Sequence, residues 1–297
     1  MATPNGDPVL RALATAKIRS LDLARHSLAW LITALAACAG DGRVAPPAEP
    51  ALLRLEAHDF SFSGDTIVSA GLTRVRLVNH GPSWHEALLT RLPDTVSADQ
   101  YLAEARAGNA FPVAATDIGG PGKVAAGDSS EVVLELEPGR YAVVCWADNH
   151  VNAGMISTLV ISVTGESAAP EPVATPVATG DVMLEDFRIV HDSGTYRRGA
   201  NLLRVRNTGE RPHDLTFYRF APGRTIRDFA TWYATRAGDP PAIPVGGMVT
   251  LAPGREGLVE LDLEPGRYFA GCGTPEQDST GTVLHIQMGM IELFEIP

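Results

Sequence analysis

The clearest periodicity in the chain is an alternation of apolar and charged residues. Leu258–Leu263 alternates apolar and acidic side chains, and Glu131–Leu136 does nearly the same. A period of two residues is typical of a strand with one buried and one exposed face. Each run leads through a Pro-Gly turn into a mainly apolar segment, Tyr141–Cys145 or Tyr268–Cys272. Short strands separated by turn residues predict a β-sandwich or a β-barrel.

Two segments have helical patterns instead. Ser97 and Gln100 have the spacing of a capping box, which predicts a helix over Ala98–Ala107 that ends before a glycine. Thr225 predicts the start of a second helix, with Asp228 in its first turn.

An internal repeat determines the predicted architecture. Matched residues recur in the same order at an offset of 127 or 128 positions. The matches are Asp59–Phe60 with Asp186–Phe187, Asn79 and Gly81 with Asn207 and Gly209, His85 with His213, Gly119–Gly120 with Gly246–Gly247, Glu137–Tyr141 with Glu264–Tyr268, and Cys145 with Cys272. So many matches at one offset indicate two copies of a single unit.

We therefore predict an all-β protein made of two tandem Greek-key β-sandwiches, each with one short helix. The units span residues 51–164 and 181–297. Between them, residues 165–180 are rich in Pro and Ala, a composition typical of an extended, semi-rigid linker. Residues 39–50 form a similar short tether.

The beginning of the chain is predicted to lie outside the fold. Arg19 and Arg25 precede the uncharged stretch Ser27–Ala37, whose 11 residues suit the apolar core of a signal peptide and are too few to span a bilayer. Leu35–Cys38 resembles the lipobox of bacterial lipoproteins, in which a cysteine after small residues is lipidated. We predict a lipoprotein signal peptide over residues 1–38 with the lipid on Cys38. A plain secretory signal and a buried helix are the alternatives.

This assignment implies a place in the cell. The lipid would anchor the protein in a membrane of the cell envelope, facing the periplasm. Because Ala39 and not Asp follows Cys38, the resemblance to Gram-negative lipoproteins implies the outer membrane.

Net charge and cysteine content limit the partners further. The chain of 297 residues carries a net charge of −11 with no basic stripe, so we expect no nucleic-acid partner. Cys145 and Cys272 remain after Cys38, and in an oxidising compartment such thiols need a disulfide, a metal or deep burial. A Cys145–Cys272 disulfide would have to join equivalent positions of two separate sandwiches, which its strict geometry makes unfavourable.

Unit one contains a set of residues with metal-ligand chemistry. His85 follows a predicted strand, and Cys145, His150 and Met155 follow in the order Cys-x4-His-x4-Met. One thiolate, two imidazoles and a weak thioether form the ligand set of a blue-copper site. In this respect the unit resembles the cupredoxins, the family of plastocyanin, azurin and rusticyanin. The resemblance implies a cupredoxin-like sandwich that binds copper through these four residues.

Unit two is similar to the same pattern. His213, Cys272, His285 and Met290 occupy the matching positions, but the step from Cys272 to His285 covers thirteen positions and not five. The inserted residues are polar and rich in turn formers, so they can bulge into solvent without moving the ligands. The resemblance thus implies one or two copper ions in the whole chain.

One feature opposes a simple blue-copper interpretation. The residue after the first histidine is often Asn in small blue-copper proteins, where it ties the two ligand loops together, but here it is Glu86 or Asp214. An ionised carboxylate cannot donate that hydrogen bond. A metal-free, cupredoxin-like scaffolding or binding module is therefore the alternative to electron transfer or copper carriage with a redox or copper-transfer partner.

We also expect the chain not to be an enzyme. Two-domain copper oxidases and nitrite reductases need extra histidines, typically His-x-His pairs and a His directly after the Cys. Trp146 and Gly273 follow the two cysteines here, and the sequence contains no His-x-His.

Overall fold

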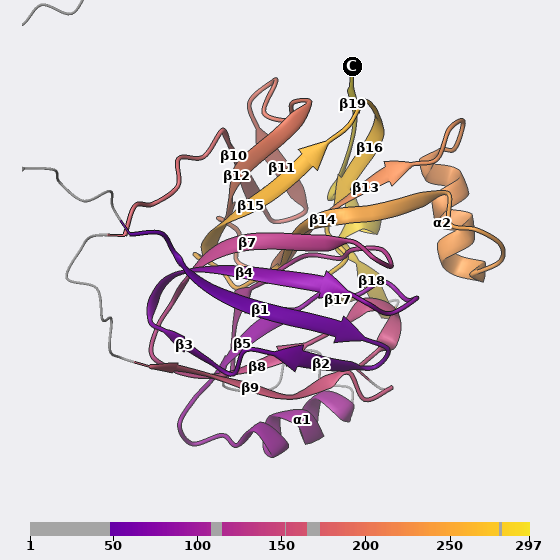
Figure 1. The fold of residues 1–297 in the computed structure, drawn as a ribbon. Helices are drawn as coiled ribbons and strands as arrows, with labels where there is room; N and C mark the ends of the chain where they lie inside the picture. Colours follow the sequence, from indigo (N-terminus) through magenta and orange to yellow (C-terminus); the bar gives the residue numbers. More distant parts are fainter. Residues whose placement is uncertain (1–47, 108–114, 152, 165–172, 279–280) are drawn as a thin grey trace, which may run out of the picture. The chain divides into compact units, whose positions relative to one another are not determined.

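Strands make up most of the residues that the computed structural model describes, which are 48–107, 115–151, 153–164, 173–278 and 281–297 (Figure 1). The elements of the first repeat are β1 (Ala51–His58), β2 (Ser61–Gly64), β3 (Ile67–Ser69), β4 (Gly71–Asn79), β5 (Leu88–Leu92), α1 (Ala98–Arg106), β6 (Thr116–Gly119), β7 (Ser129–Leu136), β8 (Gly139–Val144) and β9 (Ile156–Thr164). Those of the second are β10 (Gly180–Glu185), β11 (Arg188–His191), β12 (Gly199–Asn207), β13 (His213–Phe220), α2 (Ile226–Thr235), β14 (Ala242–Leu251), β15 (Glu256–Leu263), β16 (Gly266–Gly271), β17 (Pro275–Asp278), β18 (Gly281–Leu284) and β19 (Ile291–Ile296).

Sequence periodicity accounts for these elements. In β1, the alternate residues Leu53, Leu55 and Ala57 are fully buried. Both helices begin at the predicted residues, Ser97 and Thr225, and both starts form capping boxes, of which only the one at Ser97 was predicted. A capping box forms from residues three positions apart, so it can be recognised in the sequence alone.

Each repeat is a sandwich of two sheets. In repeat one, β2-β1-β4-β7 face β3-β9-β8-β5-β6, and in repeat two, β11-β10-β12-β15 face β14-β13-β16-β19. Most neighbours are antiparallel, but β1 with β4, β10 with β12, and β3 with β9 are parallel. The all-β tandem sandwich is confirmed. Each parallel pair joins strands that are not consecutive in the chain, so a hairpin cannot connect them.

Both sheets continue from one repeat into the other. β7 pairs with β15 to complete an eight-stranded sheet, and β6 meets β14 in a nine-stranded sheet. The two Gly-Gly pairs of the sequence repeat lie at this joint, where the Gly122 N–H donates to the Gly247 carbonyl oxygen at 2.9 Å and the Val249 N–H donates to that of Gly120 at 3.0 Å. The repeats are therefore joined side by side through backbone hydrogen bonds.

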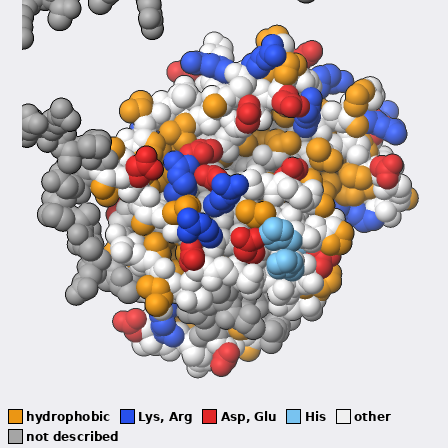
Figure 2. Space-filling view, in the orientation of Figure 1, with side chains coloured by type: hydrophobic (Ala, Val, Ile, Leu, Met, Phe, Trp, Pro, Cys, Tyr) orange, Lys and Arg blue, Asp and Glu red, His pale blue; other side chains and the backbone are white. Residues whose placement is uncertain are grey.

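The hydrophobic core also crosses the joint. One cluster of buried side chains includes Leu77 and Val132 of repeat one with Val205 and Val259 of repeat two. On the outer face in Figure 2, acidic and basic side chains are interspersed.

Several predicted segments lie outside the described residues. They are the signal peptide, Cys38, most of the tether and residues 165–172 of the linker. In the described part of the chain, no helix combines the length and apolar character needed to cross a membrane.

Candidate metal centres

A buried asparagine shapes the loop that carries the first histidine. Asn79 ends β4, and its side-chain amide donates to the Ser83 carbonyl oxygen at 2.8 Å while its Oδ1 accepts the Gly81 N–H at 2.9 Å. Asn207 makes equivalent bonds at the end of β12. These bonds turn the chain so that His85 enters the interior of the sandwich.

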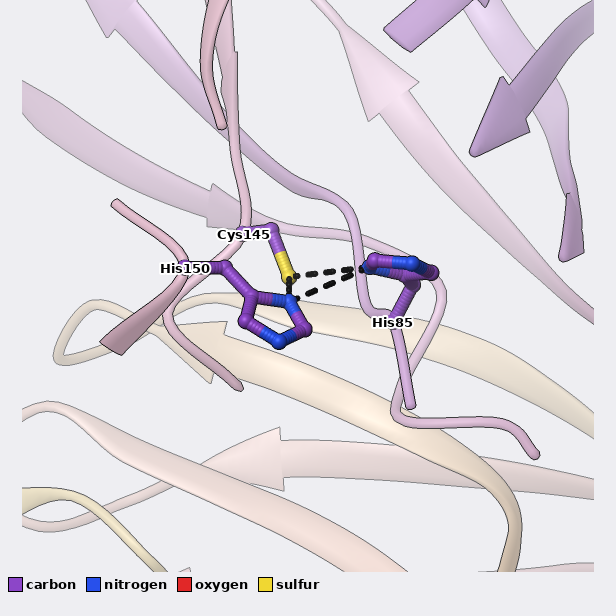
Figure 3. A group of neighbouring side chains, drawn as sticks. All are labelled: His85, Cys145 and His150. Carbon is purple, nitrogen blue, oxygen red and sulfur yellow. Dashed lines mark hydrogen bonds between the residues drawn. The ribbon is translucent and has the colours of Figure 1, made fainter. Parts of the chain in front are cut away.

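His85, Cys145 and His150 converge in repeat one (Figure 3). Cys145 Sγ lies 3.8 Å from His85 Nδ1 and 3.6 Å from His150 Nδ1, and the two nitrogens are 3.2 Å apart. The three residues are buried, with exposed fractions of 0%, 0% and 6% in the order His85, Cys145 and His150. An ion about 2 Å from each donor needs donors about 3 to 4 Å apart, so these three atoms fit one metal ion.

A carboxylate holds the far nitrogen of His85. His85 Nε2 lies 2.7 Å from Asp59 Oδ1, and Ser83 Oγ donates to Asp59 Oδ2 at 2.7 Å. Because an ionised carboxylate only accepts, a neutral His85 donates from Nε2 and its Nδ1 lone pair faces Cys145. Burial lowers the pKa of His85, although the bond to Asp59 opposes this shift. The ring is thus held neutral in the tautomer that binds metals.

Burial also sets the protonation of the other two donors. It lowers the pKa of His150, and the neighbouring His85 lowers it further. It raises the pKa of the Cys145 thiol far above its usual range, even though the backbone N–H groups of Glu86 and Ala147 bond to the sulfur. Metal binding at this site must therefore release the thiol proton.

Met155 lies on the same tight loop. A 3₁₀ turn over Ala147–Asn149 links Cys145 to His150. The Met155 N–H donates to the His150 carbonyl oxygen at 2.9 Å, and the Cys145 N–H donates to that of Met155 at 3.2 Å. The Met155 side chain is fully buried. All three C-terminal members of the predicted ligand set are thus positioned by one short loop.

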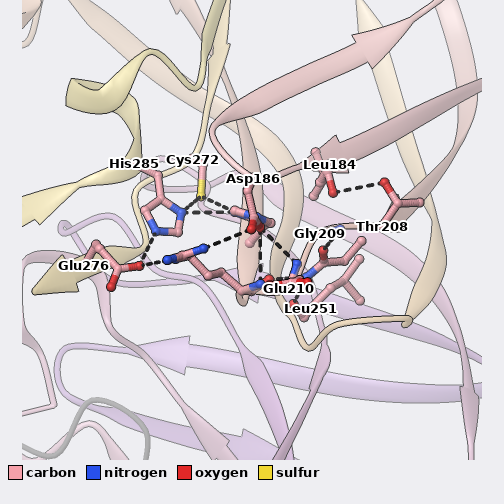
Figure 4. Close-up of polar contacts among 12 residues, drawn as sticks. Leu184, Asp186, Thr208, Gly209, Glu210, Leu251, Cys272, Glu276 and His285 are labelled. Carbon is pink, nitrogen blue, oxygen red and sulfur yellow. Dashed lines mark hydrogen bonds and ion pairs between the residues drawn. The ribbon is translucent and has the colours of Figure 1, made fainter.

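Repeat two brings its predicted residues together in the same way (Figure 4). Cys272 Sγ lies 3.8 Å from His213 Nδ1 and 3.4 Å from His285 Nδ1, and the nitrogens are 3.0 Å apart. All three are at most 1% exposed, and Met290 is fully buried. The Met290 N–H donates to the His285 carbonyl oxygen at 3.0 Å. The second set of donors also fits one ion.

A chain of charged groups surrounds this second centre. His213 Nε2 lies 3.1 Å from Asp186 Oδ1, and Arg211 Nη1 donates to Asp186 Oδ2 at 2.9 Å. Arg211 Nε donates to Glu276 Oε2 at 2.8 Å, and this oxygen is 3.5 Å from His285 Nε2. The last distance is that of an ion pair and too long for a good hydrogen bond. The network connects the outer nitrogens of both histidines.

The long step from Cys272 to His285 is folded as a hairpin. β17 and β18 pair antiparallel, and the His285 N–H donates to the Thr274 carbonyl oxygen at 3.0 Å at the base of the hairpin. The insert therefore leaves both donors in place.

The carboxylate after each first histidine connects the two ligand loops by accepting hydrogen bonds, where an asparagine would donate one. Asp214 Oδ1 accepts the Gly273 N–H at 2.7 Å, and the Asp214 N–H donates to Cys272 Sγ at 3.4 Å. In repeat one, the Glu86 carboxylate accepts the Trp146 N–H. The carboxylates can therefore link the ligand loops without an asparagine, because the loop after each cysteine offers backbone donors.

Sequence reasoning did not assign a role to the repeated Asp-Phe pair. Besides the contact of Asp59 with His85, the Phe60 ring meets His150 edge-on at a centroid distance of 5.0 Å. Phe187 meets His285 with the same geometry and the same distance. The recurrence of this pair at the repeat offset was the signal that could have identified it.

Comparison with known proteins finds similar solved structures only. No protein-family model matches the sequence, and no curated protein is similar to it in sequence. The solved structures that match include auracyanin A, a blue copper protein from Chloroflexus aurantiacus, with 18% identity over 39% of this chain and 99% of its own, and a TM-score of 0.28. A blue copper oxidase from Nitrosomonas europaea has 14% identity over 84% of this chain and 86% of its own, and a TM-score of 0.24. The copper nitrite reductase of the same organism has 11% identity, covers 84% and 94%, and has a TM-score of 0.25.

The described residues have the fold of two tandem cupredoxin-like sandwiches, and each copy contains the Cys and two His typical of a type 1 copper site. The expectation that it is not an enzyme requires correction. Structures that match 84% of the chain are those of copper oxidases and nitrite reductases, which are enzymes. At these identities, the likeness concerns the fold alone.

Proposed function

We propose that each repeat binds one copper ion and that the protein transfers electrons or carries copper. The observation that carries this proposal is the convergence, in both repeats, of one thiol sulfur and two imidazole Nδ1 atoms in a buried site. His85, Cys145, His150 and Met155 would hold the first ion. The second would be held by His213, Cys272, His285 and Met290.

The chemistry of the donors suits copper in both oxidation states. Thiolate and thioether sulfur favour Cu(I), and imidazole binds both Cu(I) and Cu(II). Bound copper would supply one-electron transfer. The chain's own contribution is to exclude water, to orient each first histidine through Asp59 or Asp186, and to direct backbone N–H groups at each sulfur.

A titration of the purified protein with Cu(II) tests this proposal. We expect two equivalents to bind and an intense thiolate-to-copper absorption band to grow with each. Cys145→Ala and Cys272→Ala should each remove one equivalent of that band, and the double variant should remove both. A colourless protein with two free thiols after titration would favour the metal-free scaffolding module instead.

The cellular place of the protein forms part of the same proposal. We propose that Cys38 carries a lipid and holds the sandwiches at the periplasmic side of the cell envelope, in the outer membrane. There they would meet a redox or copper-transfer protein. The support is the apolar stretch Ser27–Ala37 and the lipobox-like sequence before Cys38.

Labelling of cells with radioactive palmitate tests the anchor. The intact chain should incorporate label, and Cys38→Ser should not. Absence of label in the intact chain would contradict the lipid anchor.

A further inference from the structure

A cavity of about 1000 Å³ lies beside both candidate metal centres. Its wall includes the residue after the first histidine and the residue after the cysteine of each repeat: Glu86 and Trp146 from repeat one, Asp214 and Gly273 from repeat two. The predicted metal ligands themselves do not line it. A volume of this size suits a small molecule.

Aromatic side chains form much of the wall that repeat two contributes. Tyr218 and Phe269 stack with a centroid distance of 4.6 Å, and Phe229 packs against Phe269 at 4.9 Å. Tyr233 of α2 adds a partly exposed ring, and Trp146 adds another from repeat one. Flat apolar surfaces of this kind favour a planar aromatic ligand.

Lys123 supplies a buried cation to the same cavity. Its Nζ lies 3.9 Å from Glu86 Oε2, and the two side chains are 14% and 9% exposed. An ammonium group has three hydrogens to donate, but 3.9 Å exceeds hydrogen-bond length, and the described residues give Lys123 Nζ no closer acceptor. A ligand oxygen at this position would accept a hydrogen bond from an ammonium group that has no protein acceptor within hydrogen-bond distance.

The remaining charges in the wall are already compensated or negative. Asp148 and Arg236 form an ion pair, and the Arg236 guanidinium lies 4.2 Å from the centre of the Tyr233 ring. Glu86 and Asp214 would repel an additional anion placed between them. The electrostatics therefore favour a neutral ligand over a carboxylate or a phosphate.

We propose that this cavity binds a small neutral aromatic molecule of the quinone and hydroquinone class, with one ring oxygen at Lys123. A quinone carbonyl accepts a hydrogen bond from the ammonium group, and a hydroquinone hydroxyl can donate to Glu86. Both oxidation states of the ring therefore match the polar pair. This binding goes beyond the proposed copper function and does not require a metal in either centre.

Calorimetric titration of the metal-free, full-length chain with duroquinone tests the inference. The fully methylated ring of this probe resists addition of thiols. We expect saturable binding at one site, and binding about tenfold weaker in Lys123→Met, because a hydrogen bond to a charged group is lost. Arg76→Met, at an exposed arginine away from the cavity, is the matched control and should leave the affinity unchanged.

Two further probes test the ligand class. Durene, the same methylated ring without oxygens, should bind at least tenfold more weakly than duroquinone, and benzoate should not bind more tightly. Equal binding of durene, tighter binding of benzoate, or no saturable binding of duroquinone would each overturn the inference.

Lys123→Met leaves Glu86 without its cation and could therefore fail to fold, so a second variant provides an independent test. Tyr233→Ala removes a partly exposed ring from α2 and should weaken duroquinone binding several-fold. If thermal unfolding shows both variants folded and neither changes the affinity, the inference is wrong. Failure of copper binding would leave this result intact, because every titration uses metal-free protein.

Discussion

At the residue scale, a glycine, an aspartate and a histidine form one packing unit in each repeat. A side-chain carbon on Gly81 would lie 2.3 Å from Asp59 Oδ1 and 2.8 Å from His85 Nε2, so only glycine lets these two side chains meet. Gly209 lies in the same relation to Asp186, at 2.3 Å. The Asn-x-Gly match in the sequence repeat is thus explained by the contact between the aspartate and the first histidine.

Replacing Asp59 tests whether this contact prepares the first centre. Asp59→Asn keeps the size, but its amide can donate to Nε2 and thereby favour the proton on Nδ1. We expect the copper affinity of site one to fall about 10- to 100-fold. The measurement is a competition titration in a Cys272→Ala background, which isolates site one. Asp186→Asn in the same background is the control and should have no effect, and an unchanged affinity in Asp59→Asn would contradict the assigned role.

Asp117 is a partly buried carboxylate outside both centres. Its Oδ1 accepts a hydrogen bond from Thr90 Oγ1 at 2.7 Å. Burial raises the pKa of the Asp117 carboxyl from 3.8 to about 6. The folded state therefore binds this proton more tightly than the unfolded state, so stability declines as the pH rises from about 4 to about 6. We expect Asp117→Asn to raise the melting temperature by a few degrees at about pH 7.5 and to change it little at about pH 4. Thermal unfolding at both values checks this, and a lower melting temperature at the higher pH would count against it.

At the element scale, the two repeats differ most between the cysteine and the second histidine. Repeat one uses a single 3₁₀ turn, Ala147–Asn149, whereas repeat two inserts the β17–β18 hairpin. The closure entropy of a flexible loop grows only with the logarithm of its length. A paired hairpin has already lost part of that freedom before metal binds.

The two centres should consequently have similar affinities for Cu(I). Extending a flexible step from five to thirteen positions costs on the order of 1 kcal/mol. We expect site one to bind more tightly, but by less than tenfold. Competition titrations of Cys272→Ala, which keeps site one, and Cys145→Ala, which keeps site two, measure the two affinities. A larger difference, or tighter binding at site two, would show that ligand placement and not loop length controls affinity.

Local sequence signals were sufficient for some elements and not for others. The capping box at Ser97 and the helix start at Thr225 were predicted because the residues involved are only three positions apart. The hairpin of β17 and β18 was missed because its polar residues lack an apolar alternation. The parallel pairing of β1 with β4 could not be predicted from the sequence, because the pairing of strands that are not consecutive in the chain depends on the whole sheet.

The same distinction applies to the candidate centres. Cys145, His150 and Met155 are recognisable because three ligand types occur within one short segment. Asp59 was not, since it lies 26 positions before His85 and only the fold brings their side chains together. The cavity between the repeats was not predicted either, because it depends on how two similar units pack.

At the scale of the whole molecule, the joint makes one continuous body of the two repeats. Where β7 pairs with β15, Glu131 faces Glu260, and Arg74 forms ion pairs with both. This arrangement removes a like-charge repulsion across the joint. The same joint holds Glu86 and Lys123 opposite α2, where the cavity forms.

Next to this joint, the close approach of β13 and β14 at Gly247 should be essential for the second sandwich. A side-chain carbon there would lie 2.0 Å from the Leu215 carbonyl oxygen, in a backbone with φ of +137°. We expect Gly247→Ala to lower the free energy of unfolding by about 3 kcal/mol. Gly254→Ala, where φ is +76° but no atom lies within 4 Å, isolates the backbone strain and should cost about 1 kcal/mol. Equal losses in denaturant unfolding would show that the close contact with Leu215 is not the cause.

The central claim is that both repeats bind copper through one sulfur and two imidazoles. X-ray absorption spectroscopy of the copper-loaded, full-length protein measures this coordination directly. The predicted result is one short copper–sulfur bond and two copper–nitrogen bonds per ion. Either single variant, Cys145→Ala or Cys272→Ala, should show half as many short copper–sulfur bonds per protein molecule, and the double variant should show none. Copper surrounded by nitrogen and oxygen alone in the unmodified protein would contradict the account.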